Sequence, residues 1–382
     1  MKNGWQTKKL GDVATLQRGF DLPTQERVSG DVPLVTSSGI TDTHNTSAVP
    51  GPGVATGRSG SIGNVFFIED DFWPLNTVLY VKKFHGNDPK FVFHLLKNFD
   101  LKRFATGSGV PTLNRNFVHD ELVSVPPLSE QRRIVSLLDE AFAGLATSKA
   151  NAERNLKNAR TVFESHLQSV FTRSGKGWVE RSVKEIAAPT KGSIRTGPFG
   201  SQLLHSEFVD VGIAVLGIDN AVANEFRWGK SRFITPEKYR ELERYRVYPG
   251  DVLITIMGTC GRCAIVPEDI PVAINTKHIC CITLDREKCL PGYLHMYFLH
   301  SPRAREFLAK HAKGAIMAGL NMGLIQELPV VLPSTDVQAA IVKAADALHE
   351  ETERLASLYE RKLVALEALK KSLLHQAFTG GL

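Results

Sequence analysis

The sequence predicts an α+β protein with two mainly β globular domains that carry short helices. An antiparallel coiled coil of two long helices separates these domains. Three observations predict this class: the chain repeats itself once, two long segments have helical apolar spacing, and short strand-like runs fill the rest. The length of 382 residues suffices for two or three domains with sizeable cores.

The repeat is strongest in two segments that begin near Pro127 and Pro333. Gln131 matches Gln338, Ile134 matches Ile341, and the same separation persists to Phe171 and Phe378. Upstream the matches are weaker but keep their order. They pair Gly4-Trp5 with Gly177-Trp178, Gly57-x-x-Gly60 with Gly258-x-x-Gly261, Asn76-Thr77 with Asn275-Thr276, and Leu113-Asn114 with Leu320-Asn321. A period this long indicates a duplication with approximate twofold symmetry, not a solenoid.

Both repeated segments predict a helix of about 43 residues, roughly 65 Å long at 1.5 Å per residue. Their apolar residues recur at steps of three, four or seven, which gives a narrow stripe that needs a partner helix. Thr335-x-x-Gln338 predicts a capping box at the start of the second helix. The residues predicted to form the coiled coil and to dock a partner are Leu138, Leu145, Leu156, Phe163, Leu348, Leu355, Leu366 and Leu373.

The short connection after the first helix predicts how the two helices run. About five residues lead to Trp178, a reach of at most about 18 Å, so the second domain starts at the far end of the first helix. The second helix then packs on the first only by running back. We therefore expect an antiparallel pair, domains at opposite ends, and a C-terminus that returns to the first domain. The competing interpretation is an ordinary helical hairpin inside one compact enzyme.

The globular parts contain strand-like runs, including Val65–Ile68, Val78–Val81, Val252–Ile256 and Ile279–Ile282. Phe91–Leu96 and Leu294–Leu299 predict short helices, each after a proline. Stretches rich in glycine, serine, threonine and asparagine predict loops between these elements.

Composition limits the compartment and the partners. No apolar run is long enough to cross a membrane, and the first residues lack a secretory signal, so we expect a cytoplasmic protein. The net charge of +6 permits a polyanionic partner without requiring one. Five cysteines, all between Cys260 and Cys289, do not resemble a disulfide framework.

The sequence contains no recognisable catalytic motif. Gly229-Lys230-Ser231 resembles the end of a phosphate-binding loop, but the required upstream glycine is Asn224. Cys260-Gly261-Arg262-Cys263 permits a zinc site or a redox pair. Because the matching turn of the first copy, Arg58–Ser61, has no cysteine, we favour inert thiols and predict no metal. No residue is predicted to be catalytic.

Polar and basic loops are candidates for binding nucleic acid. Arginine, asparagine and glutamine can hold base edges with two hydrogen bonds, whereas lysine suits phosphates. The predicted DNA-binding residues are Arg18, Arg27, Arg58, Asn114, Arg115, Asn116, Lys191, Arg195, Gln202, Asn220, Lys230, Arg232, Lys277 and Asn321.

Particular motifs together with the duplicated layout resemble the specificity subunit of type I restriction–modification systems, over essentially the whole chain. The most specific motif is Pro126-Pro127-Leu128-Ser129-Glu130-Gln131. The others are Trp5-x-x-x-x-Leu10-Gly11-Asp12-Val13, Thr196-Gly197-Pro198-Phe199-Gly200-Ser201, Gly250-Asp251-Val252-Leu253-Ile254 and Gln376-Ala377-Phe378-Thr379-Gly380. The second copy departs from the family pattern in Ser334–Gln338 and in its cysteine-containing turn.

The resemblance implies a non-catalytic subunit in which two target-recognition domains, 1–127 and 174–333, each read half of an asymmetric bipartite DNA site. It implies conserved spacer helices at 128–173 and 334–382 that set the gap and dock two methylation subunits. The chain itself would hold no cofactor. S-adenosylmethionine would belong to the methylation subunits, and ATP and Mg²⁺ to the translocating restriction subunits.

Two alternatives remain open on the residues alone. One is a duplicated-domain enzyme acting on DNA, such as a nuclease or a zinc-dependent hydrolase. The other is a coiled-coil scaffold that binds only proteins.

Overall fold

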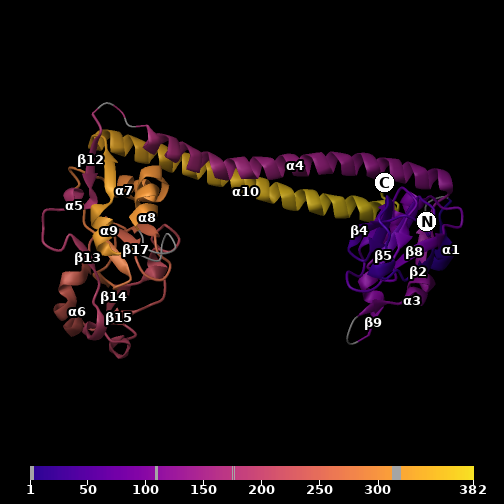
Figure 1. Ribbon diagram of the computed structural model, residues 1–382, viewed down its shortest axis with the longest axis horizontal. Coiled ribbons are helices and arrows are strands. Elements are labelled where there is room, and N and C mark those ends of the chain that lie inside the picture. The colour runs from indigo at the N-terminus through magenta and orange to yellow at the C-terminus, as the bar shows by residue number, and fades with distance from the viewer. Residues whose placement is uncertain (1–3, 108–110, 174, 176, 312–319) are drawn as a thin grey trace. The chain divides into compact units, whose positions relative to one another are not determined.

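The computed structural model describes residues 4–107, 111–173, 175, 177–311 and 320–382. The chain forms two compact units. Unit 1 comprises Met1–Arg154 and Tyr359–Leu382, and unit 2 comprises Asn155–Leu358. The two long helices, α4 (Leu128–Thr172) and α10 (Thr335–Thr379), each contribute to both units (Figure 1).

Unit 1 is built mainly of short strands with three short α-helices. Its strands are β1 (Gln6–Lys9), β2 (Thr15–Arg18), β3 (Val32–Thr36), β4 (Gly39–His44), β5 (Gly53–Gly57), β6 (Val65–Ile68), β7 (Trp73–Pro74), β8 (Val78–Lys83), β9 (Ala105–Thr106), β10 (Thr112–Leu113) and β11 (Leu122–Val125). Its short helices are α1 (Leu10–Val13), η1 (Thr24–Glu26), α2 (Pro89–Asn98), η2 (Leu101–Phe104) and α3 (Arg115–Asp120).

Unit 2 has the same kinds of element. Its strands are β12 (Val179–Ser182), β13 (Ile194–Thr196), β14 (Ile213–Leu216), β15 (Phe233–Ile234), β16 (Arg246–Val247), β17 (Val252–Thr255), β18 (Cys263–Ile265), β19 (Ala273–Asn275), β20 (Ile279–Ile282) and β21 (Pro329–Leu332). Its short helices are α5 (Val183–Ile186), η3 (Gly200–Gln202), η4 (His205–Glu207), η5 (Ile218–Asn220), α6 (Pro236–Leu242), η6 (Glu243–Tyr245), α7 (Pro291–His300), α8 (Pro302–His311) and α9 (Met322–Glu327).

The sheet topology of unit 1 recurs in unit 2. In unit 1, β1 pairs with β11, a four-stranded sheet has the order β2-β8-β5-β6, and β3 is parallel to β7. In unit 2, β12 pairs with β21, the four-stranded order is β13-β20-β17-β18, and β14 is parallel to β19. The internal repeat predicted from the sequence is therefore confirmed in the fold.

Both units contain the same glycine turn between two strands of their four-stranded sheets. Gly60 and Gly261 have φ values of +82° and +76°, a backbone conformation that side chains disfavour. Each lies in the turn that joins β5 to β6 or β17 to β18. The matching glycines seen in the sequence therefore mark one turn used twice.

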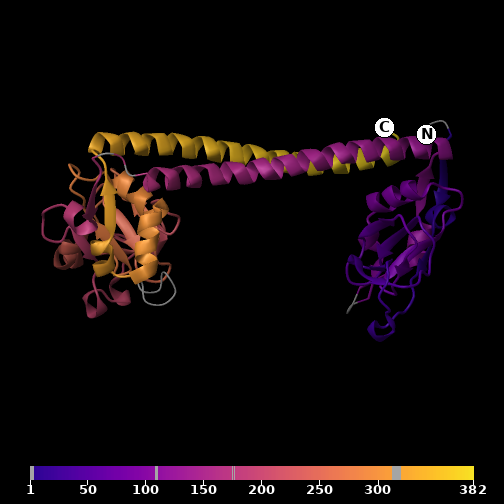
Figure 2. The same cartoon turned by 45° about the horizontal axis from the view of Figure 1, so that its top comes forward.

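The long helices pack against each other within each unit, as both views show (Figures 1 and 2). In unit 1, Lys149 Nζ lies 2.8 Å from Glu367 Oε1. In unit 2, the rings of Phe163 and His349 are 4.8 Å apart. Because these partners advance in opposite directions along the two helices, the pair is antiparallel. Buried alanines in both helices, including Ala152, Ala159, Ala345 and Ala356, permit the close approach.

The C-terminus packs on unit 1, as the short connection predicted. The ring of Phe378 lies 5.3 Å from that of Phe91 on α2. Arg133 donates a hydrogen bond of 3.1 Å to the carbonyl oxygen of Leu382. The end of α10 thus completes the core of unit 1, which also contains Ala377.

Gln131 and Gln338 make equivalent buried contacts at the starts of the long helices. Gln131 donates to the carbonyl oxygen of Pro126 and accepts from the backbone N–H of Asp88, both at 2.9 Å. Gln338 donates to the carbonyl oxygen of Pro333 and accepts from the backbone N–H of Leu290, at 3.0 and 2.9 Å. The capping box predicted for Thr335 and Gln338 is therefore wrong, because the Gln338 side chain hydrogen-bonds the backbone of the globular part of the unit instead.

Candidate nucleic-acid interface

Three predicted arginines gather around one hollow of about 430 Å³ in unit 1. Arg27 lines it and pairs with Asp42 at 3.1 Å. Arg58 donates to the carbonyl oxygen of Asn76, which also lines the hollow, at 3.0 Å. Arg18 pairs with Asp21, a third lining residue, at 3.2 Å. Loops after β2, β3 and β7 thus bring together cations and amides that can hydrogen-bond DNA.

The predicted residues around α3 divide into exposed and structural groups. Arg115 and Asn116 are exposed on this helix. Asn114 caps the helix, because its side-chain oxygen accepts from the backbone N–H of Asn116 at 3.0 Å. Asn321 caps α9 in the same way, by accepting from the N–H of Leu324 at 3.0 Å. The repeated Leu-Asn pair thus marks a helix cap in both units.

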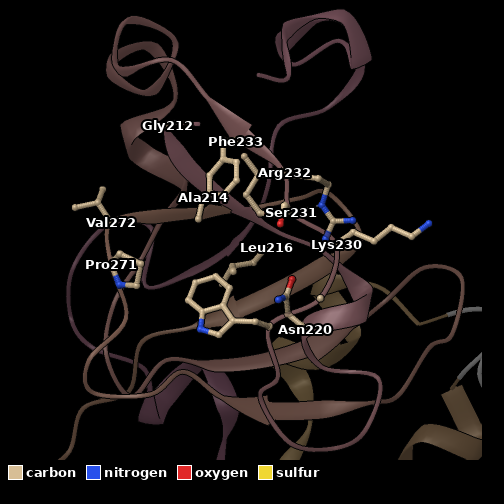
Figure 3. A pocket seen from close by; sticks show the side chains of 13 residues that line it. Gly212, Ala214, Leu216, Asn220, Lys230, Ser231, Arg232, Phe233, Pro271 and Val272 are labelled. Carbon is tan, nitrogen blue, oxygen red and sulfur yellow. Dashed lines mark hydrogen bonds between the residues drawn. The ribbon is translucent and has the colours of Figure 1, made fainter. Parts of the chain in front are cut away.

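A second hollow, of about 370 Å³, brings together Asn220, Lys230 and Arg232 in unit 2. Figure 3 shows Lys230 and Arg232 on one side of it and Pro271 and Val272 on the other. Arg232 pairs with Asp219 at 2.6 Å. Burial would raise the pKa of Asp219, but hydrogen bonds from Arg232 and from the backbone of Lys230 outweigh it and lower that pKa.

Lys277 belongs to the same basic neighbourhood. It precedes His278 in the turn between β19 and β20. Burial lowers the pKa of His278, and the charges of Lys277 and Arg232 lower it further. Lys277 and Arg232 therefore both lie close enough to His278 to disfavour its protonated form.

A larger hollow of about 940 Å³ lies next to Lys191 and Arg195. Tyr245 and Tyr248 also line it. Tyr245 donates a hydrogen bond of 2.9 Å to the side chain of Gln202, which brings this third predicted residue to the same region. Lys191 and Gln202 are exposed.

Arg195 and Asn220 do not have the exposure that DNA binding requires. Arg195 is 7% exposed, and its guanidinium contacts Asp251 at 2.6 Å and Thr283 Oγ1 at 2.9 Å. Asn220 is 2% exposed and bonds the backbone of Gly217 and Arg227. We correct both assignments, because these side chains already satisfy buried backbone or charged groups.

Sequence reasoning missed the exposed aromatic residues beside these cations. Trp228 is 59% exposed and lines the hollow that contains Lys230, and Tyr248 is 45% exposed beside Arg195. The alternation of aromatic and cationic residues in Phe226-Arg227-Trp228-Gly229-Lys230 was the available signal.

Comparison with known proteins finds similarity to type I specificity subunits. A family model described as the type I restriction modification DNA specificity domain matches residues 2–157. The EcoBI specificity subunit of Escherichia coli is 24% identical, over 100% of this chain and 86% of that protein. A specificity subunit of Haemophilus influenzae described as putative is also 24% identical, over 95% and 92% of the two chains. The first part of this chain thus matches the type I DNA specificity domain, and nearly its whole length is similar to type I specificity subunits.

Solved structures show the same fold. A crystal structure of an HsdS subunit from Thermoanaerobacter tengcongensis matches with a TM-score of 0.67 and 18% identity, over 100% of this chain and 98% of that one. A chain from a study of complex assembly in a type I restriction–modification system matches with a TM-score of 0.72, 17% identity and coverage of 100% and 99%.

The eight residues predicted for the coiled coil of this chain are all at least partly buried. They include Leu138, at 1% exposed, and Phe163, which packs against His349. The large apolar residues that these helices expose are instead Leu128, Leu137, Val162, Val337, Leu358, Val364 and Leu369. The exposed apolar residues of the two helices are therefore different side chains from the eight predicted ones.

The five cysteines of this chain are free thiols. Cys263 points into the core of unit 2, and burial raises the pKa of its thiol. Burial also raises the pKa of Cys280 and Cys289, each to about 12. Across the described residues, no group of three or more histidine, cysteine or acidic side chains is arranged to hold a metal ion. None of the described helices is long and apolar enough to span a membrane.

Proposed function

We propose that this specificity subunit recognises DNA through both globular parts, each reading one half of an asymmetric bipartite site. One observation carries the proposal: the same fold occurs twice, and each copy has its own basic hollow made from different loops. Two copies of one scaffold with different loops suit two unrelated half-sequences.

We assign the recognition domains to residues 1–127 and 174–333 and the spacer helices to 128–173 and 334–382. The members of the predicted set that are exposed or partly exposed are the residues that reach the DNA in this proposal. Phosphate contacts from Lys191, Lys230 and Lys277 would position the duplex, whereas Arg18, Arg115 and Asn116 would contact base edges.

The helix pair is proposed to act as a ruler and as a docking surface. Helices that are continuous over their length keep a fixed spacing between two reading surfaces, and spacing sets which half-sites are read together. The exposed apolar residues of α4 and α10, with Val364 at 72% exposure, supply a surface that a protein partner would cover. We assign this surface to two methylation subunits.

The chemistry of the complex is assigned to its other subunits. In this proposal the methylation subunits bind S-adenosylmethionine, and the restriction subunits use ATP and Mg²⁺. The specificity subunit contributes recognition without catalysis and works in the cytoplasm, where cellular DNA is present.

Mapping methylated adenines in cells that express this chain with its methylation subunit tests the proposal. We expect one bipartite motif that disappears when the chain is deleted. Replacing residues 174–333 by another recognition domain should change one half-site and leave the other intact. A change in both halves would contradict two independent readers, and unchanged methylation with confirmed partner expression would favour a protein scaffold.

A further inference from the structure

The hollow beside β14 in unit 2 combines an apolar surface with an exposed aromatic ring and cations. Ala214, Leu216 and Phe233 line it together with Pro271 and Val272 (Figure 3). The remaining lining residues include the segment Trp228–Arg232. Sites for small ligands are typically mostly apolar with a few polar groups, which describes this hollow.

The segment that carries Trp228 is anchored at both ends. Asn220 donates a hydrogen bond of 2.9 Å to the carbonyl oxygen of Arg227, just before the tryptophan. Asp219 accepts from the backbone N–H of Lys230 and from the guanidinium of Arg232, each at 2.6 Å, just after it. Trp228 therefore lies on a loop that neighbouring side chains hold in place.

The packing of the loop leaves no room for a side chain at Gly229. A Cβ atom on Gly229 would lie 1.9 Å from the carboxylate of Asp219, so the chain passes directly over that side chain. The ring of Trp228 meets that of Phe226 edge-on, with centroids 5.4 Å apart, and remains 59% exposed. An anchored loop thus exposes a large aromatic ring to solvent, which favours stacking of a ligand at low entropic cost.

We propose that this hollow takes one unstacked base of the target DNA, with its face against Trp228 and its phosphate near Lys230. The inference rests on the proposed DNA recognition and goes further by naming what this site holds. A volume of about 370 Å³ suits a single base rather than a length of duplex. Stacking on an aromatic ring beside cations is how proteins hold single unpaired bases.

The same site is not expected in unit 1. The hollow there is lined by Asp21–Thr24, Arg27, Thr36–Ser38 and Leu75–Thr77, a set that contains no aromatic residue. The two hollows therefore differ in whether an aromatic residue lines them. We assign displacement of a base to the half-site that unit 2 reads.

A mismatch scan of the mapped target tests the proposal with the complete methylation complex. Duplexes carry one mismatch at a time in either half-site, and their affinities are compared with that of the paired duplex. A weakened pair lowers the cost of unstacking a base. We expect one position in the half-site of unit 2 at which a mismatch raises affinity about tenfold, because it removes about 1.4 kcal/mol of the cost of unpairing the base.

Three variants separate stacking from folding defects. Trp228→Ala should abolish the gain in affinity that the mismatch gives at that position, whereas Trp228→Phe should keep most of this gain. Leu204→Ala removes an apolar side chain of unit 2 that is 50% exposed and does not line the hollow, so it should keep the gain entirely. Thermal melting of each complex shows whether the subunit is folded.

The outcomes distinguish this proposal from the proposed function. One outcome overturns the base site alone. In it, the wild-type complex binds its paired target more tightly than a scrambled duplex, but no mismatch raises its affinity. A gain that survives in Trp228→Ala also overturns it. A complex that binds target and scrambled duplexes equally overturns DNA recognition and the base site together.

Discussion

Replacing Gln131 by leucine tests whether a buried hydrogen-bond cluster holds the globular part of unit 1 on its helix. The side chain is 2% exposed. Its nitrogen donates to Asn87 Oδ1 at 2.8 Å and to the Pro126 carbonyl at 2.9 Å, and its oxygen accepts from the Asp88 N–H at 2.9 Å. Leucine fills similar space but offers none of these groups a partner.

The cost follows from the two backbone groups that lose their partner. Each unsatisfied buried donor or acceptor costs about 1–3 kcal/mol, so the two together should destabilise unit 1 by about 2–6 kcal/mol in Gln131→Leu. The loss of the hydrogen bond to Asn87 adds less to this free-energy cost, because Asn87 is only partly buried and also bonds the backbone carbonyls of Val13 and Phe84. For a unit of this size the expected fall in melting temperature is roughly 5–15 °C.

Differential scanning calorimetry of the full chain with its methylation subunits measures this change. Gln25→Leu is the matched control, since Gln25 is exposed in unit 1 and should shift melting by no more than a surface substitution does. Gln338→Leu should produce a loss of similar size in unit 2, because that side chain is fully buried with equivalent partners. The reasoning is refuted if Gln131→Leu and Gln25→Leu have equal effects.

Two further substitutions test a buried ion pair and a buried histidine. Arg195→Met should cost about 3–5 kcal/mol in urea unfolding, because it leaves the carboxylate of Asp251 buried without its cation; the exposed pair of Arg240 and Glu237 provides the control, and Arg240→Met should cost less than about 1 kcal/mol. Burial lowers the pKa of His94, and the nearby charge of Asp139 offsets this only in part. The unfolded histidine gains a proton below about pH 6.5 while the folded one stays neutral, so stability present above that pH falls as pH decreases toward the folded pKa. His94→Leu should flatten this decline in melting temperature between pH 7 and 5, and an unchanged slope would show that other groups cause it.

The regular parts of the fold were predictable because their signals are local. Apolar steps of three and four predicted α4 and α10, and compact β-rich runs predicted β6, β8, β17 and β20. The repeat added what local patterns lack, since it identified two copies of one topology. The short connection before Trp178 then sufficed to predict an antiparallel helix pair.

The candidate site was predictable only in part, because burial depends on partners far along the chain. Arg195 lies in a glycine- and serine-rich segment that looks exposed, but Asp251 in a later turn neutralises it. Asn220 likewise looks like a surface amide, yet it holds the backbone beside Trp228. Local sequence reports which residue types are present, whereas the tertiary fold decides which of them remain available for DNA.

The two glutamine clusters explain why the repeat is sharp at the helix starts and faint in the loops. Each cluster joins the first turn of a long helix to the segment before α2 or α7, and each uses the same atoms of glutamine. Any change there leaves buried backbone groups unsatisfied, so few alternatives are compatible with folding. The loops around Arg27 and Trp228 carry no such shared constraint, and exposed side chains can change there at little cost in stability. A fixed junction with variable loops is the arrangement that lets one scaffold read two different half-sequences without altering the path of its helices.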